Sequence, residues 1–253
     1  MNINELFRHD VVFSIPLFGH MIPVTSTIIM MWIIMAVIIL LAVILVRPKK
    51  FKKVPKGGQL AAETLVDTIG KILKGNIGEE KYRFFVPYFG TILLFLVFAN
   101  IASIFNIFPT GAQMYALTGW NIFKHWTFSI EPPTSDLNLP LTLALMTVAL
   151  IPLASIKFRG IKGYFKSFLK PLPIMLPFNV LDYATRTLSL ALRLYGNIFA
   201  GVVIMDLLYL GSVFVKPVVP VASAFFDLFD AGLQAYIFVF LSSIYIAEAV
   251  NEE

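Results

Sequence analysis

Two arginines interrupt an apolar segment near the carboxyl end of the chain, Arg186–Gly201. A charged side chain near the centre of a bilayer costs about 2.5–3.5 kcal/mol on insertion scales, so it needs a partner or an aqueous cavity. At about 100° per residue, this segment forms a helix with one polar face. We call that face the polar stripe; it comprises Arg186, Ser189, Arg193, Asn197 and Gly201. The opposite face is apolar and would contact lipid or packed helices; it comprises Leu188, Leu192, Tyr195, Phe199 and Val202. We expect the polar stripe to be the working surface.

Both arginines allow other interpretations. Arg186 lies near a helix end, where a long side chain can extend to the lipid headgroups without a further role. This explanation fits Arg193 less well, because apolar residues surround it on both sides. A purely structural ion pair with Asp182 or Asp206 is the alternative for Arg193.

The last two apolar segments also carry five acidic residues: Asp182, Asp206, Asp227, Asp230 and Glu248. Asp227, Asp230 and Gln234 share one side of the second segment, and Tyr245 and Glu248 follow further along it. Acidic, amide and hydroxyl groups spaced through an apolar segment are what a proton relay or ion pathway requires. Structural hydrogen bonds between helices are the alternative for any single residue. Five acids and two arginines together are too many to be incidental.

Three polar residues fall on one face of an earlier apolar segment: Asn100, Ser103 and Asn106. They would line a water path or form hydrogen bonds between helices, and the sequence leaves both open.

The composition indicates a polytopic membrane protein. Hydrophobic residues make up 58% of 253 and charged residues 14%, against about 45–50% and about 25% in soluble domains. Zero cysteines exclude disulfides and thiolate metal sites, and three scattered histidines argue against a metal cluster. The net charge of +5 comes from loops between apolar runs, which favours membrane topology over a nucleic-acid partner.

The first part of the chain predicts one membrane span and one surface helix. Residues 1–20 form a short external segment without signal-peptide features, and residues 21–46 are an uncharged first span. Six basic residues follow in 47–56, which places this loop in the cytoplasm and the N-terminus outside. Residues 59–75 predict an amphipathic helix, either interfacial or docked on other subunits.

The middle of the chain predicts a helical hairpin over residues 84–156. Its external loop, 109–136, contains prolines, glycine and a single lysine. The second helix ends with five basic residues in 157–170, on the same side as the first basic loop. Pro152 is a candidate kink near the inner end.

Residues 171–250 contain two segments of about 35 residues each, divided near Gly211–Pro220. A perpendicular span needs about 20 residues, so both helices must tilt strongly or lie partly along the membrane plane. The predicted fold is therefore all-α, with five transmembrane helices and one amphipathic surface helix in a single membrane domain, 1–253. The C-terminus is expected in the cytoplasm.

Three stretches resemble one known family. Residues 189–201 read SLALRLYGNIFAG, similar to the arginine signature SLxLRLFGNxxAG of subunit a of the bacterial-type F-type (rotary) ATP synthases. Residues 132–145, PPTSDLNLPLTLAL, resemble a second family run, and 233–249, LQAYIFVFLSSIYIAEA, resemble its C-terminal helix. The matches follow the family's order and span about the last half of the chain.

The resemblance implies a stationary subunit whose last two helices form a tilted hairpin against a rotating ring of small subunits, each with a buried carboxylate. Two half-channels would pass H⁺ or Na⁺ to and from the ring, coupling ion flow to ATP synthesis, and Arg193 would separate them. Residues implied in ion translocation are Arg193, Asn197, Asp227, Gln234, Asp206, Asp230, Arg186, Glu248 and Ser189. Residues implied as polar lining of the half-channels are Asn100, Ser103, Asn106, Asp136, Asn138, Asp182 and Tyr245.

The chain departs from a familiar family pattern at two places. Many members have AGE where this chain has Ala200-Gly201-Val202, and often a histidine where it has Asp227. The resemblance therefore implies that an acidic group has moved to the neighbouring helix. Asp206 is a possible partial substitute.

The resemblance also implies the partners: the ring, peripheral-stalk subunits, membrane lipid and, indirectly, the soluble ATPase head. We expect no cofactor and no catalysis by the chain itself, because no nucleotide-binding P-loop motif is present. We expect no nucleic-acid partner, because the basic residues lie in loops between apolar runs. The expected location is the bacterial plasma membrane. A secondary transporter that binds a small anion at Arg193 is the alternative, although no inverted repeat is apparent. A scaffold without transport fits the charged final segments less well.

Overall fold

The computed structural model describes residues 11–17, 20–45, 54–101, 133–168, 176–210 and 231–251, with the single residues 221, 225 and 229. Within them the chain forms six long helices, a short 3-10 helix η4 (Pro133–Ser135) and a two-stranded hairpin. The predicted all-α membrane fold is confirmed apart from this hairpin.

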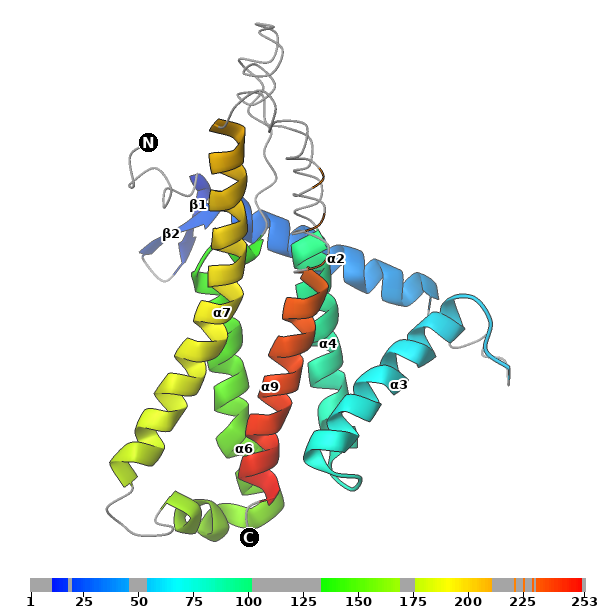
Figure 1. The fold of residues 1–253 in the computed structure, drawn as a ribbon, viewed down its shortest axis with the longest axis vertical. Helices are drawn as coiled ribbons and strands as arrows, with labels where there is room; N and C mark the ends of the chain where they lie inside the picture. The colour runs from blue at the N-terminus through cyan, green and yellow to red at the C-terminus, as the bar shows by residue number, and fades with distance from the viewer. Residues whose placement is uncertain are drawn as a thin grey trace, which may run out of the picture.

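Four antiparallel helices form the body of the protein (Figure 1). They are α4 (Tyr82–Ile101), α6 (Asn138–Phe168), α7 (Leu176–Leu210) and α9 (Ala231–Asn251). α6 lies behind α7 and α9 and packs against both, whereas α7 and α9 contact each other much less. One core cluster joins all four helices, with Phe89, Leu96, Leu194 and Ile246 completely buried. α6 is thus the platform on which the two C-terminal helices are positioned.

Helix α3 (Gly58–Ile77) confirms the predicted amphipathic helix and packs against α4 and α9. Ile69, Leu73 and Ile77 belong to the core cluster of the body. Burial of such aliphatic side chains contributes about 1.5–3 kcal/mol each relative to water. At its end, Lys74 donates a hydrogen bond to Glu79, which lowers the pKa of the Glu79 carboxyl and raises the pKa of Lys74. α3 is therefore docked on its own chain.

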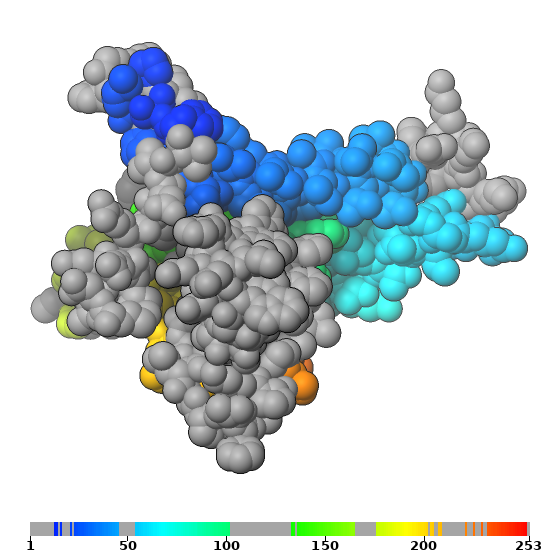
Figure 2. Space-filling model, turned by 90° about the horizontal axis from the view of Figure 1, so that it is seen from above, coloured from blue at the N-terminus to red at the C-terminus, as the bar shows by residue number. Residues whose placement is uncertain are grey.

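Helix α2 (Ser26–Leu45) crosses the end of the body at a large angle to α4 (Figure 1). Seen from above, α2 and α3 project together to one side (Figure 2). They meet where Leu45 lies against Gly58, so closely that a Cβ on Gly58 would come within 2.8 Å of Leu45. α2 exposes most of its apolar side chains. Such a surface needs lipid or other subunits to cover it.

The N-terminal part of the first predicted span is a strand instead of a helix. Strands β1 (Val11–Leu17) and β2 (His20–Thr25) form an antiparallel hairpin, so α2 begins at Ser26 instead of residue 21. Valine, isoleucine, phenylalanine and threonine favour strands, and Pro16 and Pro23 are tolerated because both strands are edges. This composition was a signal for the hairpin.

Helix α6 continues beyond its predicted end at residue 156 and reaches Phe168. Its direction changes at Gly160, where φ is 76° and ψ is 165°, and the last part lies across the end of the body (Figure 1). The break is therefore at Gly160, although Pro152 also lies within the helix. Positive φ is accessible to glycine at little cost because it lacks a Cβ. Part of the predicted basic loop 157–170 is thus helical.

Four helices within the described residues are long and apolar enough to cross a membrane. They are Ser26–Leu45, Tyr82–Ile101, Asn138–Tyr164 and Gly232–Asn251. α7, the remaining predicted span, has 35 residues, matching the length expected from the sequence. The division between the last two segments, near Gly211–Pro220, lies outside the described residues.

We predict that Gly160→Ala destabilises the protein by about 1–2 kcal/mol, because an L-residue is strained at this positive φ. Gly75→Ala is the matched control, since both glycines have open space where a Cβ would lie and Gly75 is inside α3. The control should be neutral or slightly stabilising. Thermal inactivation of the detergent-solubilised complex measures both variants, and equal midpoints for the two would contradict this account of the break.

Candidate functional site

Helix α7 packs on α6 through a face that lies between the polar stripe and the predicted apolar face. The buried residues on this face are Thr187, Leu190, Ala191 and Leu194. Leu188 and Leu192, expected opposite the polar stripe, are 52% and 56% exposed. α7 therefore presents Leu188, Leu192 and part of its polar stripe to the outside of the chain. The physical reason is that α6 covers only one sector of the helix.

Arg193 is exposed on this outer surface. Among the described residues, it forms no hydrogen bond or ion pair. The structural pair with Asp182 is excluded, because Asp182 binds Arg186 instead. An arginine stays protonated under all physiological conditions. Arg193 is thus a fixed positive charge that faces outward without a partner from the described part of its own chain.

One turn further along α7, Asn197 reaches across to α9. Its Nδ2 donates a hydrogen bond to Oε1 of Gln234 at 2.7 Å. Gln234 is 1% exposed, and its Nε2 has no hydrogen-bond partner among the described residues. A buried amide nitrogen without a partner costs about 1–3 kcal/mol unless water or another group satisfies it. The Asn197–Gln234 pair therefore leaves one donor available for a water molecule or a passing group.

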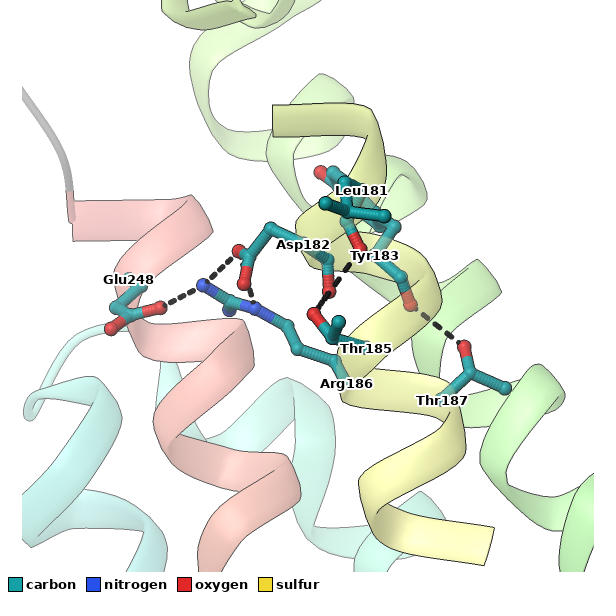
Figure 3. A network of polar contacts seen from close by, with 7 residues as sticks. All are labelled: Leu181, Asp182, Tyr183, Thr185, Arg186, Thr187 and Glu248. Carbon is teal, nitrogen blue, oxygen red and sulfur yellow. Dashed lines mark hydrogen bonds and ion pairs between the residues drawn. The ribbon is translucent and has the colours of Figure 1, made fainter. Parts of the chain in front are cut away.

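Toward the other end of the hairpin, Arg186 connects α7 with α9 (Figure 3). Its guanidinium lies 2.6 Å from Asp182 Oδ2, four residues earlier, and 2.6 Å from Glu248 Oε2 on α9. Its Nε donates a second hydrogen bond to Asp182, and the guanidinium lies 4.6 Å from the ring centroid of Tyr245. This arginine does not simply extend to the lipid headgroups. It contacts Asp182, Glu248 and Tyr245, three residues that the sequence indicated separately as candidate site residues.

The three charged side chains of this network differ in exposure. The Arg186 side chain is 21% exposed, whereas Asp182 and Glu248 are 49% and 52% exposed. The cation is enclosed by Tyr245 and the two acids, and the carboxylate oxygens remain accessible from outside. This network therefore pairs one largely enclosed cation with two acidic side chains that remain accessible from outside.

The two crossings between α7 and α9 lie far apart along the helices. Arg186 and Asn197 are separated by about 16 Å of helix, and Gln234 and Glu248 by about 21 Å. The side chains of Arg186 and Glu248 are long enough to span the difference between these two axial separations. Arg193 lies on α7 between these crossings, close to Asn197. The order along the hairpin is therefore an amide pair, a free arginine and an ion-pair network.

Two of the predicted lining residues outside the hairpin, Asn100 and Asp136, have structural partners. Asn100 is 5% exposed, and its Oδ1 accepts a hydrogen bond from Thr134 at 2.7 Å. Asp136 Oδ1 accepts from the backbone N–H of Asn138 at 2.9 Å, a capping bond at the start of α6. Buried Asn100 therefore connects α4 with η4, the interhelical alternative left open by the sequence. Ser189 is half-buried on α7.

Several predicted site residues are not placed. Ser103, Asn106, Asp227 and Asp230 lie outside the described residues. Asp206 belongs to α7, but its side chain is not described. The relocated carboxylate at Asp227 stays a prediction.

Sequence reasoning missed the residues that hold the C-terminal end of α9. Lys81 Nζ donates to the carbonyl of Val250 at 3.0 Å, and Arg159 donates to the carbonyl of Ala249 at 3.3 Å. Asn76 donates to Ser243 Oγ at 2.6 Å. In the sequence, Arg159 was interpreted only as one of the basic residues that mark the cytoplasmic side of the membrane. Its spacing gives no indication of a partner 90 residues away.

The geometry and the comparison with known families agree. A hairpin with a fixed cation between two polar crossings can stabilise a negative charge that approaches from outside the chain. The charge could then move away from the cation toward either crossing. The family model for the ATP synthase A chain matches residues 28–247. This region includes Arg186, Arg193, Asn197 and Gln234, and it ends one residue before Glu248. The chain therefore belongs to the ATP synthase A chain family.

Proposed function

We propose that Arg193 is the fixed charge that separates two ion half-channels in this protein. As a family member, the chain is the stationary ion-channel subunit of an F-type ATP synthase, a multi-pass membrane protein within the membrane part of that complex. The family match does not support the secondary-transporter alternative. The roles of single residues, the partners beyond this complex and the orientation are our proposals.

One observation carries the proposal: Arg193 faces outward without a partner in the described chain, while Arg186 on the same stripe is fully engaged. A rotating ring that carries buried carboxylates fits the exposed face around Arg193. A guanidinium about 4 Å from a carboxylate gains roughly 4 kcal/mol at an effective dielectric of about 20. This energy favours the ionised carboxylate, so each ring site would release its ion beside Arg193.

The two crossings would serve the half-channels on either side. The Asn197–Gln234 pair lies on one side of Arg193, with the free Gln234 N–H available for water. The Arg186 network lies on the other side, with accessible carboxylates on Asp182 and Glu248. We propose that ions pass along these groups, with Ser189 and Tyr245 beside them. Asp227, Asp230 and Asp206 would continue the pathway in parts that are not described.

The remaining proposals concern location and partners. The bacterial plasma membrane and cytoplasmic basic ends fit the positions of the Lys and Arg residues. The exposed apolar side chains of α2 fit lipid and peripheral-stalk helices. The soluble ATPase head would contact this subunit only indirectly.

For Arg193 we predict that Arg193→Ala abolishes ATP-driven ion pumping and opens a passive leak, because no fixed charge separates the half-channels. Arg193→Lys keeps the charge but loses the planar fork, so it should impair pumping severely with less leak. Leu145→Ala, exposed on α6 away from this face, is the control and should pump. Gradient formation in vesicles measures all three. An Arg193→Ala enzyme that still builds a gradient would refute the proposal.

For the Arg186 network we predict a milder loss than for Arg193, because Arg186 connects helices of the same chain. Arg186→Ala and Glu248→Ala should each lower pumping, and the double variant should be no worse than Arg186→Ala, since the two groups act as one pair. Glu63→Ala on the exposed side of α3 is the control for loss of an acid. Additive effects in this double-mutant cycle would separate Glu248 from Arg186 in function.

For the orientation we predict that residue 54 faces the cytoplasm and residue 124 faces outward. The chain has no cysteine, so single cysteines at Val54 and Lys124 can be labelled without a background from this chain. Membrane-impermeant maleimide added from each side of oriented vesicles gives the result. Labelling of both positions from the same side would overturn the topology.

A further inference from the structure

We propose that Lys81 is a positioning residue that fixes the axial register of α9 against α7, acting together with Asn76 and Arg159. We call these three residues the latch. The inference rests on the proposed function, because the register matters through the two polar crossings of the hairpin. It assigns a role to residues that contact neither the polar stripe nor Arg193.

The first part of the latch holds the last turn of α9. Carbonyl groups at the end of a helix have no partner within the helix, and a nearby cation satisfies them. Lys81 Nζ donates to Val250 O at 3.0 Å and to Asn251 Oδ1 at 3.1 Å. Arg159 of α6 donates to Ala249 O at 3.3 Å. Two cations from separate parts of the chain therefore hold three consecutive residues, beginning directly after Glu248.

The second part of the latch connects α9 with α3. Asn76 Nδ2 donates to Ser243 Oγ at 2.6 Å, and Ser243 Oγ in turn donates to the carbonyl of Phe240. Asn251 Nδ2 donates to the carbonyl of Ile77 at 3.0 Å. Ser243 is completely buried, so its bond to Asn76 is shielded from water. These contacts prevent α9 from sliding along its own axis.

The hairpin itself supplies little to define this register. α7 and α9 contact each other much less than each contacts α6. Their crossings are short polar contacts, 2.7 Å at Asn197–Gln234 and 2.6 Å at Arg186–Glu248. A shift of one residue moves a helix by about 1.5 Å. A shift of one full turn, about 5.4 Å, would separate both pairs beyond the usual hydrogen-bond range of about 2.7–3.2 Å.

The polar contacts that oppose axial movement of α9 therefore come from α3, α6 and the turn before α4. The crossings depend on the axial position of α9, and they place Gln234 and Glu248 on either side of Arg193 along the pathway. Loss of the latch should change the alignment of α9 with α7 before it changes the fold, because the apolar core between α4, α6 and α9 remains.

The test compares Lys81→Ala with Lys81→Arg, which keeps the charge and the donors. Lys74→Ala is the matched control: Lys74 lies in the same region, pairs with Glu79 and is 48% exposed. A direct readout of register is disulfide formation between Asn197→Cys and Gln234→Cys in native membranes. Asn197→Cys with Phe238→Cys, one turn along α9, reports the shifted register.

In the Lys81→Ala background we expect the rate of the 197–234 crosslink to fall about tenfold, the size expected from loss of a hydrogen bond to a charged group. The 197–238 crosslink should rise relative to it. In separate preparations without cysteines, Lys81→Ala should lower ion pumping per assembled complex, while Lys81→Arg and Lys74→Ala pump normally.

An unchanged crosslink pattern in Lys81→Ala would overturn the latch, whatever happens to pumping. Reduced assembly with normal pumping per complex would also overturn it, since Lys81 would then only stabilise the protein. Arg193→Ala, measured in the same vesicles, tests the proposed function by itself. Pumping by Arg193→Ala would refute that function and leave the crosslink result interpretable as a statement about register.

Discussion

The cost of charge in an apolar segment is the constraint on which this structure depends. Two arginines seven residues apart on α7 meet it in different ways. Arg186 is satisfied within the chain by Asp182, Glu248 and the ring of Tyr245. Arg193 has no such group among the described residues. Its charge therefore has to be compensated by water, by a partner subunit or by a residue outside the described ranges.

The packing of α6 makes this difference possible. By covering only the sector of α7 that includes Leu190 and Leu194, it holds the helix in place and leaves Arg193 uncovered. The same helix carries α9, so that the two members of the hairpin are aligned by a third element. The two helices contact each other much less than each contacts α6, and they are joined by the polar pairs Asn197–Gln234 and Arg186–Glu248. This arrangement fits the proposed ion pathway along these groups.

Exposed apolar side chains next to an exposed charge indicate a surface that lipid or another subunit covers in a membrane complex. Leu188 and Leu192 beside Arg193, and most of α2, would be poorly placed on a soluble monomer. In a complex they are surfaces for lipid and other subunits. The body of the chain is held together by its own core, whereas α2 and the outer side of α7 expose apolar side chains that lipid or other subunits have to cover. This division fits a subunit that stays fixed while a partner moves past it.

The sequence alone determined the membrane class, the long helices and the position of the polar stripe on its helix, because hydropathy and helical periodicity are local properties. It also gave the family through three short motifs, and the match over residues 28–247 confirmed it. Tertiary structure decided which groups meet. Asp182 pairs with Arg186, Glu248 crosses from another helix, and Lys81 reaches the end of α9 169 residues later. It also decided that α6 turns at Gly160 and that a third face of α7 is buried. These outcomes depend on how separate helices pack, and no spacing within one helix specifies the rotation or axial position of another.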